Sequence, residues 1–211
     1  MEEAETQIQT QSLINWLGTG SINLFGRPFS GKDTQANMLA KLFNCSVIGG
    51  GDIIRNSKRY DLHKELETGL LTPQTEYLKL VLPYLSLKKF AKKPLILSSL
   101  GRWHGEEPAI MKAAAESNHA IKMVIHLNIP ESLVYKRWEA AKKLGDRGSR
   151  NDDTSNSIMT RLKEYTNKTL PVLDYYKQRG LLIEVDGSNS RKQVSEQIIK
   201  ELIAASKNKV L

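Results

Sequence analysis

The sequence has little of several features that mark particular classes of protein. One cysteine, Cys45, stands among 211 residues, which excludes an intramolecular disulfide and disfavours a cysteine-based metal site. No apolar run approaches the roughly 20 residues of a membrane span, and the acidic start Met1-Glu2-Glu3 is unlike a secretory signal. Internal repeats and low-complexity runs are also lacking. These absences predict a cytoplasmic protein that does not bind membranes.

The charge balance is basic, with a formal net charge of +8 at pH 7. Such an excess fits either lysines and arginines spread over solvated helix faces or a basic cleft for an anionic ligand. Basic segments interleaved with aromatic residues, as in proteins that bind single-stranded nucleic acids, are missing, so we expect no nucleic-acid partner. Hydrophobic residues make up 40% of the chain, which is enough to build the core of one domain.

Residues 26–34, GRPFSGKDT, have the pattern of a phosphate-binding loop. The apolar residues 21–25 before them indicate a short buried strand, and residues 34–43 after them have helical spacing. Gly26 and Gly31 let backbone N–H groups turn towards an anion, the helix N-terminus favours negative charge, and Lys32 can reach outer phosphates. Asp33 stands where the general pattern has a serine or threonine hydroxyl for the metal. The loop predicts a nucleotide site but not a reaction.

Strands and helices alternate along the rest of the chain. Further strands are predicted at 45–48, 95–97, 121–127 and 181–185. Further helices are predicted at 59–68, 74–90, 108–117, 131–144, from 155 onward with a break or kink at Pro171, and 190–206. This order predicts an α/β fold with a parallel sheet of about five strands, flanked by helices and binding ligands at the strands' carboxyl ends. Residues 1–20 form an accessory segment with a short helix, which packs on its own domain or on a second subunit; we favour the first.

Several motifs together resemble the adenylate kinase group of nucleoside monophosphate kinases, over residues 21 to about 200. The glycine loop is similar in its Pro28 and in its ending Thr34-Gln35, and Gly50–Arg55 resembles the segment that holds the acceptor monophosphate. Residues 69–73 resemble the turn beside the acceptor base, and the charged residues 147–161 resemble a short, zinc-free lid with its hinge. The resemblance implies a P-loop NTPase fold, a kinase domain over 21–211, an acceptor-binding insertion at about 50–92 and a lid at about 145–154.

The resemblance also implies the site residues. Those expected to bind ATP are Gly26, Pro28, Ser30, Gly31, Lys32, Asp33, Thr34 and Arg147. Those expected to bind the acceptor nucleotide are Gly50, Asp52, Arg55, Leu71, Ser99, Arg102 and Glu106. Those expected to act in catalysis are Lys32, Arg102, Arg150 and Arg161. Taken alone, Arg147 also fits a solvated loop charge, Asp52 a helix cap, and Asp152 and Asp153 a hinge or cap.

Several positions depart from the family pattern. Phe29 and Asp33 replace small residues, and Ser98 replaces an aspartate that would organise magnesium through water. Asp33 either holds such a water or turns outward into solvent. Glu106, or Glu107 after a shift of one residue, stands in place of a glutamine that reads adenine. An ionised carboxylate, which only accepts hydrogen bonds, suits guanine best. No protein metal site is predicted; Mg²⁺ is expected to arrive with ATP, held by phosphates and water.

The residue types suit phosphoryl transfer in their own right, because that chemistry needs positioning and cations around the moving group. Arginine matches phosphate oxygens with two donors and stays charged. The resemblance implies that the terminal phosphate of ATP is moved to AMP, and we also expect a monomer. Two alternatives stay open: a kinase of the same fold for GMP, CMP or UMP, and a nucleotide-binding protein without activity.

Overall fold

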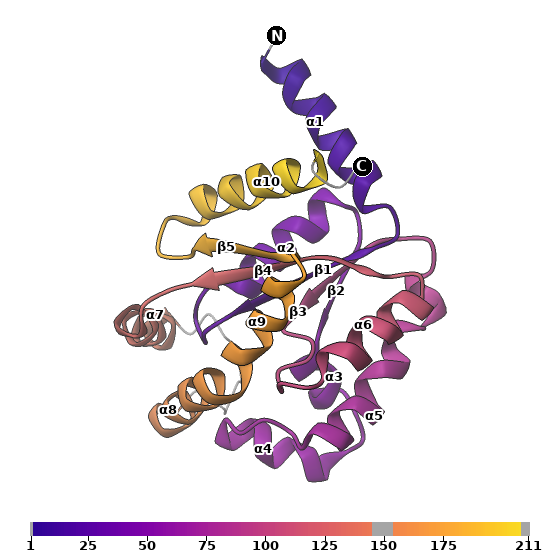
Figure 1. The fold of residues 1–211 in the computed structure, drawn as a ribbon. Coiled ribbons are helices and arrows are strands. Elements are labelled where there is room, and N and C mark those ends of the chain that lie inside the picture. Colours follow the sequence, from indigo (N-terminus) through magenta and orange to yellow (C-terminus); the bar gives the residue numbers. More distant parts are fainter. Residues whose placement is uncertain (1, 145–153, 208–211) are drawn as a thin grey trace.

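The computed structural model describes residues 2–144 and 154–207. In this part of the chain, five strands form one parallel sheet with the order β2-β3-β1-β4-β5 (Figure 1). The strands are β1 (Ser21–Gly26), β2 (Ser46–Gly49), β3 (Leu95–Ser98), β4 (Ile121–Asn128) and β5 (Leu182–Asp186). The predicted α/β fold with a parallel sheet of about five strands is thus confirmed.

Helices connect the strands. They are α1 (Glu2–Leu17), α2 (Lys32–Leu42), α3 (Gly50–Arg55), α4 (His63–Thr68), α5 (Gln74–Leu85), α6 (Glu107–Glu116), α7 (Glu131–Leu144), α8 (Ser155–Glu164), α9 (Leu170–Gln178) and α10 (Arg191–Lys207). Three further turns are the 3₁₀-helices η1 (Tyr60–Leu62) and η2 (Lys88–Phe90) and the π-helix η3 (Tyr165–Thr169). The helix expected at 59–68 is therefore split into η1 and α4, and the one expected at 74–90 ends at Leu85. No helix within the described residues is long and apolar enough to cross a membrane.

Helices cover both faces of the sheet (Figure 1), and a cluster of buried side chains lies on each face. Ile22 and Leu24 of β1 are fully buried against α1, α2 and α10, whereas Phe25 is buried on the other face against α9. Alternation of side chains along a strand explains this division. Leu13 and Leu17 join the first cluster, so the second half of α1 belongs to the core of this domain. Its first half extends beyond the body of the molecule (Figure 1).

The helical segment that begins at Ser155 passes through a π-helix. Of the break or kink expected at Pro171, the structure excludes the break, because the chain stays helical from Ser155 to Gln178 and Pro171 lies in the first turn of α9. Proline has no N–H to donate and its ring crowds the carbonyl four residues earlier. The turn before it is wide, with the Leu170 N–H bonded to the Tyr165 carbonyl five residues back. The extra residue in this turn changes the rotation of α9 about the helix axis relative to α8, so a different side of each helix faces the rest of the domain.

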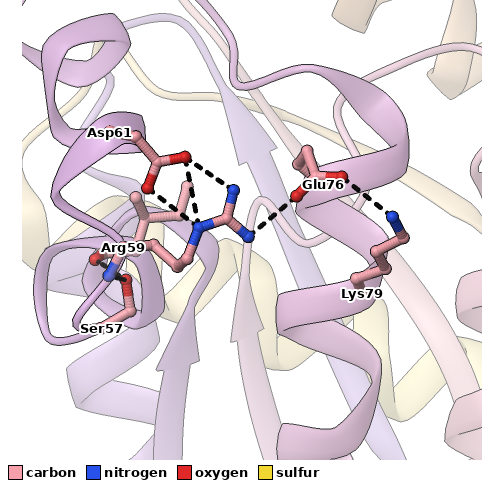
Figure 2. Close-up of polar contacts among 6 residues, drawn as sticks. Ser57, Arg59, Asp61, Glu76 and Lys79 are labelled. Carbon is pink, nitrogen blue, oxygen red and sulfur yellow. Dashed lines mark hydrogen bonds and ion pairs between the residues drawn. The ribbon is translucent and has the colours of Figure 1, made fainter.

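A network of exposed ion pairs ties together the two halves of the insertion between β2 and β3 (Figure 2). Arg59, just before η1, binds Asp61 at 2.7 Å and reaches Glu76 in the first turn of α5 at 2.8 Å. Glu76 also accepts from Lys79 at 3.0 Å. The hydrogen bond from Arg59 lowers the pKa of Asp61, and those from Lys79 and Arg59 lower the pKa of Glu76. Because solvent screens these charges, the network sets the orientation of η1 on α5 more than it adds stability.

Candidate active site

The glycine loop joins the end of β1 to the start of α2. Gly31 directly precedes α2 with φ 91°, a left-handed conformation that glycine adopts without strain. The N-terminus of α2 therefore opens onto the loop, as in anion-binding sites of other proteins. The side chain of Lys32 is 15% exposed, and its Nζ lies 3.6 Å from Oδ2 of Asp33. The predicted strand, loop and helix are all present.

Phe29 explains one departure of the loop from the family pattern. Its φ is 58°, in the left-handed region that a non-glycine residue occupies at a cost of about 1–2 kcal/mol. The ring packs against a small cluster of buried residues formed by Ile129, Val134, Ile158 and Leu162. Burial of an aromatic ring offsets a strain of that size. The loop thus keeps a glycine-like backbone while its side chain anchors it to α7 and α8.

The carboxyl ends of neighbouring strands bring the other predicted segments to the loop. Ser98 of β3 pairs in register with both Leu24 of β1 and Gly49 of β2, so α3 and the chain after β3 begin beside the loop. Together they border a cleft of about 660 Å³. The predicted site residues that line it are Gly26, Pro28, Ser30, Gly31, Lys32, Asp33, Thr34, Asp52, Arg55, Leu71, Ser99, Arg102 and Arg161.

Basic side chains gather in this cleft. Burial lowers the pKa of Arg102, and the positive charges of Arg161 and Arg55 near it lower that pKa further, whereas Asp33 opposes the shift. Arg55 is held by Asp52, with 2.5 Å between Nη2 and Oδ1. Cations that repel one another in a half-closed cleft indicate a polyanionic ligand. The lid residues Arg147, Arg150, Asp152 and Asp153 lie outside the described residues, and their predicted roles stay predictions.

Two predicted acceptor residues do not line the cleft. Gly50 backs onto α5, where a Cβ would come within 2.3 Å of the Tyr77 hydroxyl, so glycine is required there for packing. Glu106 is fully buried; its Oε2 accepts from the Trp103 N–H at 3.1 Å. Burial raises the pKa of Glu106 to about 7. With no accessible atom, Glu106 can meet a base only after the side chains around it move.

The buried carboxyl of Glu106 predicts a pH-dependent stability. Its pKa in the folded chain, about 7, exceeds the ordinary 4.5, so the stabilisation present below pH 4.5 is lost as the pH rises through 7. We expect Glu106→Gln to lose less stability than the wild type as the pH rises. Urea unfolding measures the free energy of unfolding at pH 5.5 and at pH 8. Between these two pH values it should fall by roughly 2 kcal/mol more in the wild type than in the variant. Glu116→Gln, on the exposed end of the same helix, is the control; equal losses in wild type and Glu106→Gln would contradict the burial argument.

The turn expected beside the acceptor base is attached to α8 and η3. The Leu71 N–H donates to Glu164 Oε2 at 3.1 Å, and Lys168 donates to the same oxygen at 2.6 Å. Lys168 Nζ also lies 3.9 Å from the centre of the Trp103 ring, and Trp103 Nε1 donates to the Thr72 carbonyl at 2.9 Å. This side of the cleft is therefore held by hydrogen bonds, an ion pair and a cation–π contact.

The structure adds Arg137, which the sequence did not single out. From α7 its guanidinium donates to the Ser30 carbonyl at 3.2 Å and to the Gly187 carbonyl at 2.8 Å, and it lines the cleft. Burial lowers its pKa. It holds the glycine loop against the turn after β5 and presents a planar cation to the cleft. One arginine in a charged helix gives no signal in sequence, because its partners are backbone carbonyls from distant segments.

Comparison with known families agrees with this geometry. A model of the adenylate kinase family matches residues 24–181, which span the loop, the insertion, the arginines and η3. The chain belongs to the adenylate kinase family. It is therefore a nucleoside monophosphate kinase, a transferase that binds nucleotides, with the P-loop fold of that family.

Relatives of this kinase match over most of its length. It is 31% identical to an adenylate kinase of Azobacteroides pseudotrichonymphae over 86% of this chain and 96% of the relative. It is 28% identical to an adenylate kinase of Methanothrix thermoacetophila, over 86% of this chain and 98% of the relative. The adenylate kinase of Leptospira biflexa is also 28% identical, over 84% and 96%. The predicted resemblance is thus confirmed.

Proposed function

We propose that this kinase transfers the terminal phosphate of ATP to AMP and releases two molecules of ADP. The observation that carries the proposal is the convergence of Lys32, Arg55, Arg102 and Arg161 on one cleft beside a phosphate loop. Phosphoryl transfer needs such cations, because negative charge must be neutralised on the donor, the acceptor and the moving group together. The relatives' name, adenylate kinase, supports AMP as the acceptor.

Each cation has a role that follows from its place. Lys32, at the N-terminus of α2, binds the outer phosphates of ATP. Arg55, positioned by Asp52 on α3, binds the phosphate of the acceptor. Arg102 and Arg161 lie near each other and stabilise the transferring group as it passes between the nucleotides. A partly enclosed cleft also keeps water from the phosphoryl group, which limits hydrolysis of ATP.

Mg²⁺ belongs to the proposal as an ion that arrives with ATP. Among the described residues no group of three or more His, Cys, Asp or Glu side chains could hold a metal by itself. The cleft does offer hard oxygen atoms next to the loop, from Asp33 and Ser98, and these suit an ion held mainly by phosphates and water. When bound, the ion would neutralise charge on the phosphates of ATP.

A neutral Glu106 would favour adenine as the acceptor base, once the side chains around it have moved so that it meets the base. A neutral carboxyl donates through its O–H and accepts through its carbonyl oxygen, which matches the ring nitrogen and amino group of adenine. The raised pKa of about 7 keeps a large share of Glu106 neutral near physiological pH. The sequence argument for guanine assumed an ionised carboxylate. AMP therefore stays the acceptor that we propose.

A coupled assay that detects ADP tests the proposal. The full chain is given ATP with AMP, GMP, CMP or UMP in turn, and we expect the highest kcat/KM with AMP. A higher value with another monophosphate would assign the chain to that acceptor. ATP binding without turnover on any of the four would contradict catalysis and support a nucleotide-binding role. Sedimentation at several concentrations tests the predicted monomer.

A second measurement tests the contact with the base. In the wild type, the preference for AMP over GMP should fall as the pH rises from 6 to 8, because ionised Glu106 no longer donates. Glu106→Gln should keep its preference at both pH values and exceed the wild type at pH 8 by about 1–2 kcal/mol in specificity. Identical pH profiles and rankings in the two proteins would show that Glu106 does not read the base.

A further inference from the structure

Asp33 occupies an unusual place for a carboxylate. In phosphate loops of the pattern found here, the residue after the lysine supplies a hydroxyl to the metal that accompanies the nucleotide. This chain has Asp33 at that position, in the first turn of α2 and on the wall of the cleft. The negative charge of Asp33 repels a polyphosphate bound beside it. A second cation, in addition to Lys32, is therefore needed at this point to offset that repulsion.

The side chain of Asp33 is held in place and does not turn away into solvent. Its Oδ1 accepts a hydrogen bond from Ser98 Oγ at 2.7 Å, and its Oδ2 lies 3.6 Å from Lys32 Nζ. Ser98 ends β3, so the bond joins two neighbouring segments of the cleft. The side chain is still 51% exposed, so a ligand in the cleft can approach it. Of the two alternatives that the sequence left open, the hydrogen bond from Ser98 favours a carboxylate that holds a water of the metal over one that turns outward into solvent.

A role in capping does not account for this arrangement. Gly31 precedes α2 and no side chain caps this end of the helix by a hydrogen bond. Asp33 reaches instead across to β3, where the short hydroxyl of Ser98 leaves room for it. The pair thus places a carboxylate between the carboxyl end of β3 and the N-terminus of α2, on the side of Lys32.

We propose that Asp33, oriented by Ser98, binds the divalent cation that arrives with ATP, through the water shell that Mg²⁺ retains. The site then accepts the magnesium complex of ATP and discriminates against metal-free ATP. This inference rests on the proposed binding of ATP at the loop. The inference predicts two opposite effects when the charge of Asp33 is removed: the magnesium complex of ATP binds more weakly, and metal-free ATP binds more tightly.

Calorimetry of the full chain measures these two effects without any turnover. ATP is titrated into wild type and Asp33→Asn, once with excess Mg²⁺ and once with EDTA. We expect the variant to bind the magnesium complex more weakly and metal-free ATP more tightly, so that the ratio of the two affinities falls at least about 10-fold. Ser98→Ala, which releases the carboxylate, should move the ratio in the same direction by less.

Two further variants sharpen the test. Asp52→Asn makes the same chemical change at another carboxylate of the cleft and should leave the ratio unchanged. Asp33→Ser combined with Ser98→Asp moves the charge across the hydrogen bond and should restore most of the wild-type ratio. An unchanged ratio in Asp33→Asn, or an equal change for both forms of ATP, overturns the inference. A wild type that binds neither form would instead refute the proposed function.

Discussion

Lys32→Ala should lower kcat at least about 100-fold while leaving the melting temperature nearly unchanged. A cation on the outer phosphates stabilises charge that develops in the transition state, and such contributions are worth roughly 3 kcal/mol or more. The Lys32 side chain is largely enclosed beside the loop, so water cannot replace it fully. The coupled assay with ATP and AMP measures the loss.

Lys41→Ala provides the matched control for Lys32. Lys41 lies in the last turn of the same helix, exposed and away from the cleft. The variant Lys41→Ala should leave kcat unchanged. Near-normal turnover of Lys32→Ala would remove the phosphate-binding role of the loop and with it the main support for the proposed reaction.

Arg161→Ala should also lower kcat by about 100-fold or more, again with a small effect on folding. Arg161 lines the cleft from α8 and lies close enough to Arg102 to lower its pKa, so we expect both cations to act on the same bound phosphates. Arg161→Lys keeps the charge but loses the forked donor, and it should recover only part of the rate.

Lys163→Ala, on the exposed side of α8, is the control for Arg161. The decisive comparison is between the loss of kcat and the change in melting temperature of Arg161→Ala. If the melting temperature of Arg161→Ala falls far enough to account for the lost activity, the arginine holds the structure and does not act on phosphate. We expect Arg150→Ala to lower kcat to the same extent, and this expectation rests on the resemblance of the sequence to adenylate kinases.

Much of the fold could be predicted because its signals are local. Apolar runs such as 95–97 and 121–127 mark buried strands wherever they later pair, and the loop 26–34 carries its own glycines and lysine. The order of the strands was not predicted, since periodicity says which residues are buried but not against which strand. The π-helix was missed for a related reason: Pro171 signals a disturbed helix but not whether the chain breaks or widens its turn.

The site was predicted only where residue type and spacing suffice. Lys32, Arg55, Arg102 and Arg161 lie in the cleft as expected. Arg137 was missed because its role depends on carbonyl groups that are remote in sequence. The burial of Glu106 was missed as well, because a glutamate next to another glutamate in a polar segment gives no indication that the fold encloses it.

The contact between Gly69 and α8 joins two sides of the cleft in which we propose that the nucleotides bind. Gly69 ends α4 with φ 85°, and a Cβ there would come within 2.5 Å of the Ser157 carbonyl oxygen. The acceptor side of the cleft thus rests directly on the helix that carries Arg161, and movement of either one displaces the other. We expect cooperative binding: ATP should raise the affinity for the acceptor, and thermodynamic reciprocity requires the acceptor to raise the affinity for ATP by the same factor. A side chain at position 69 would part these surfaces and make the two binding events independent.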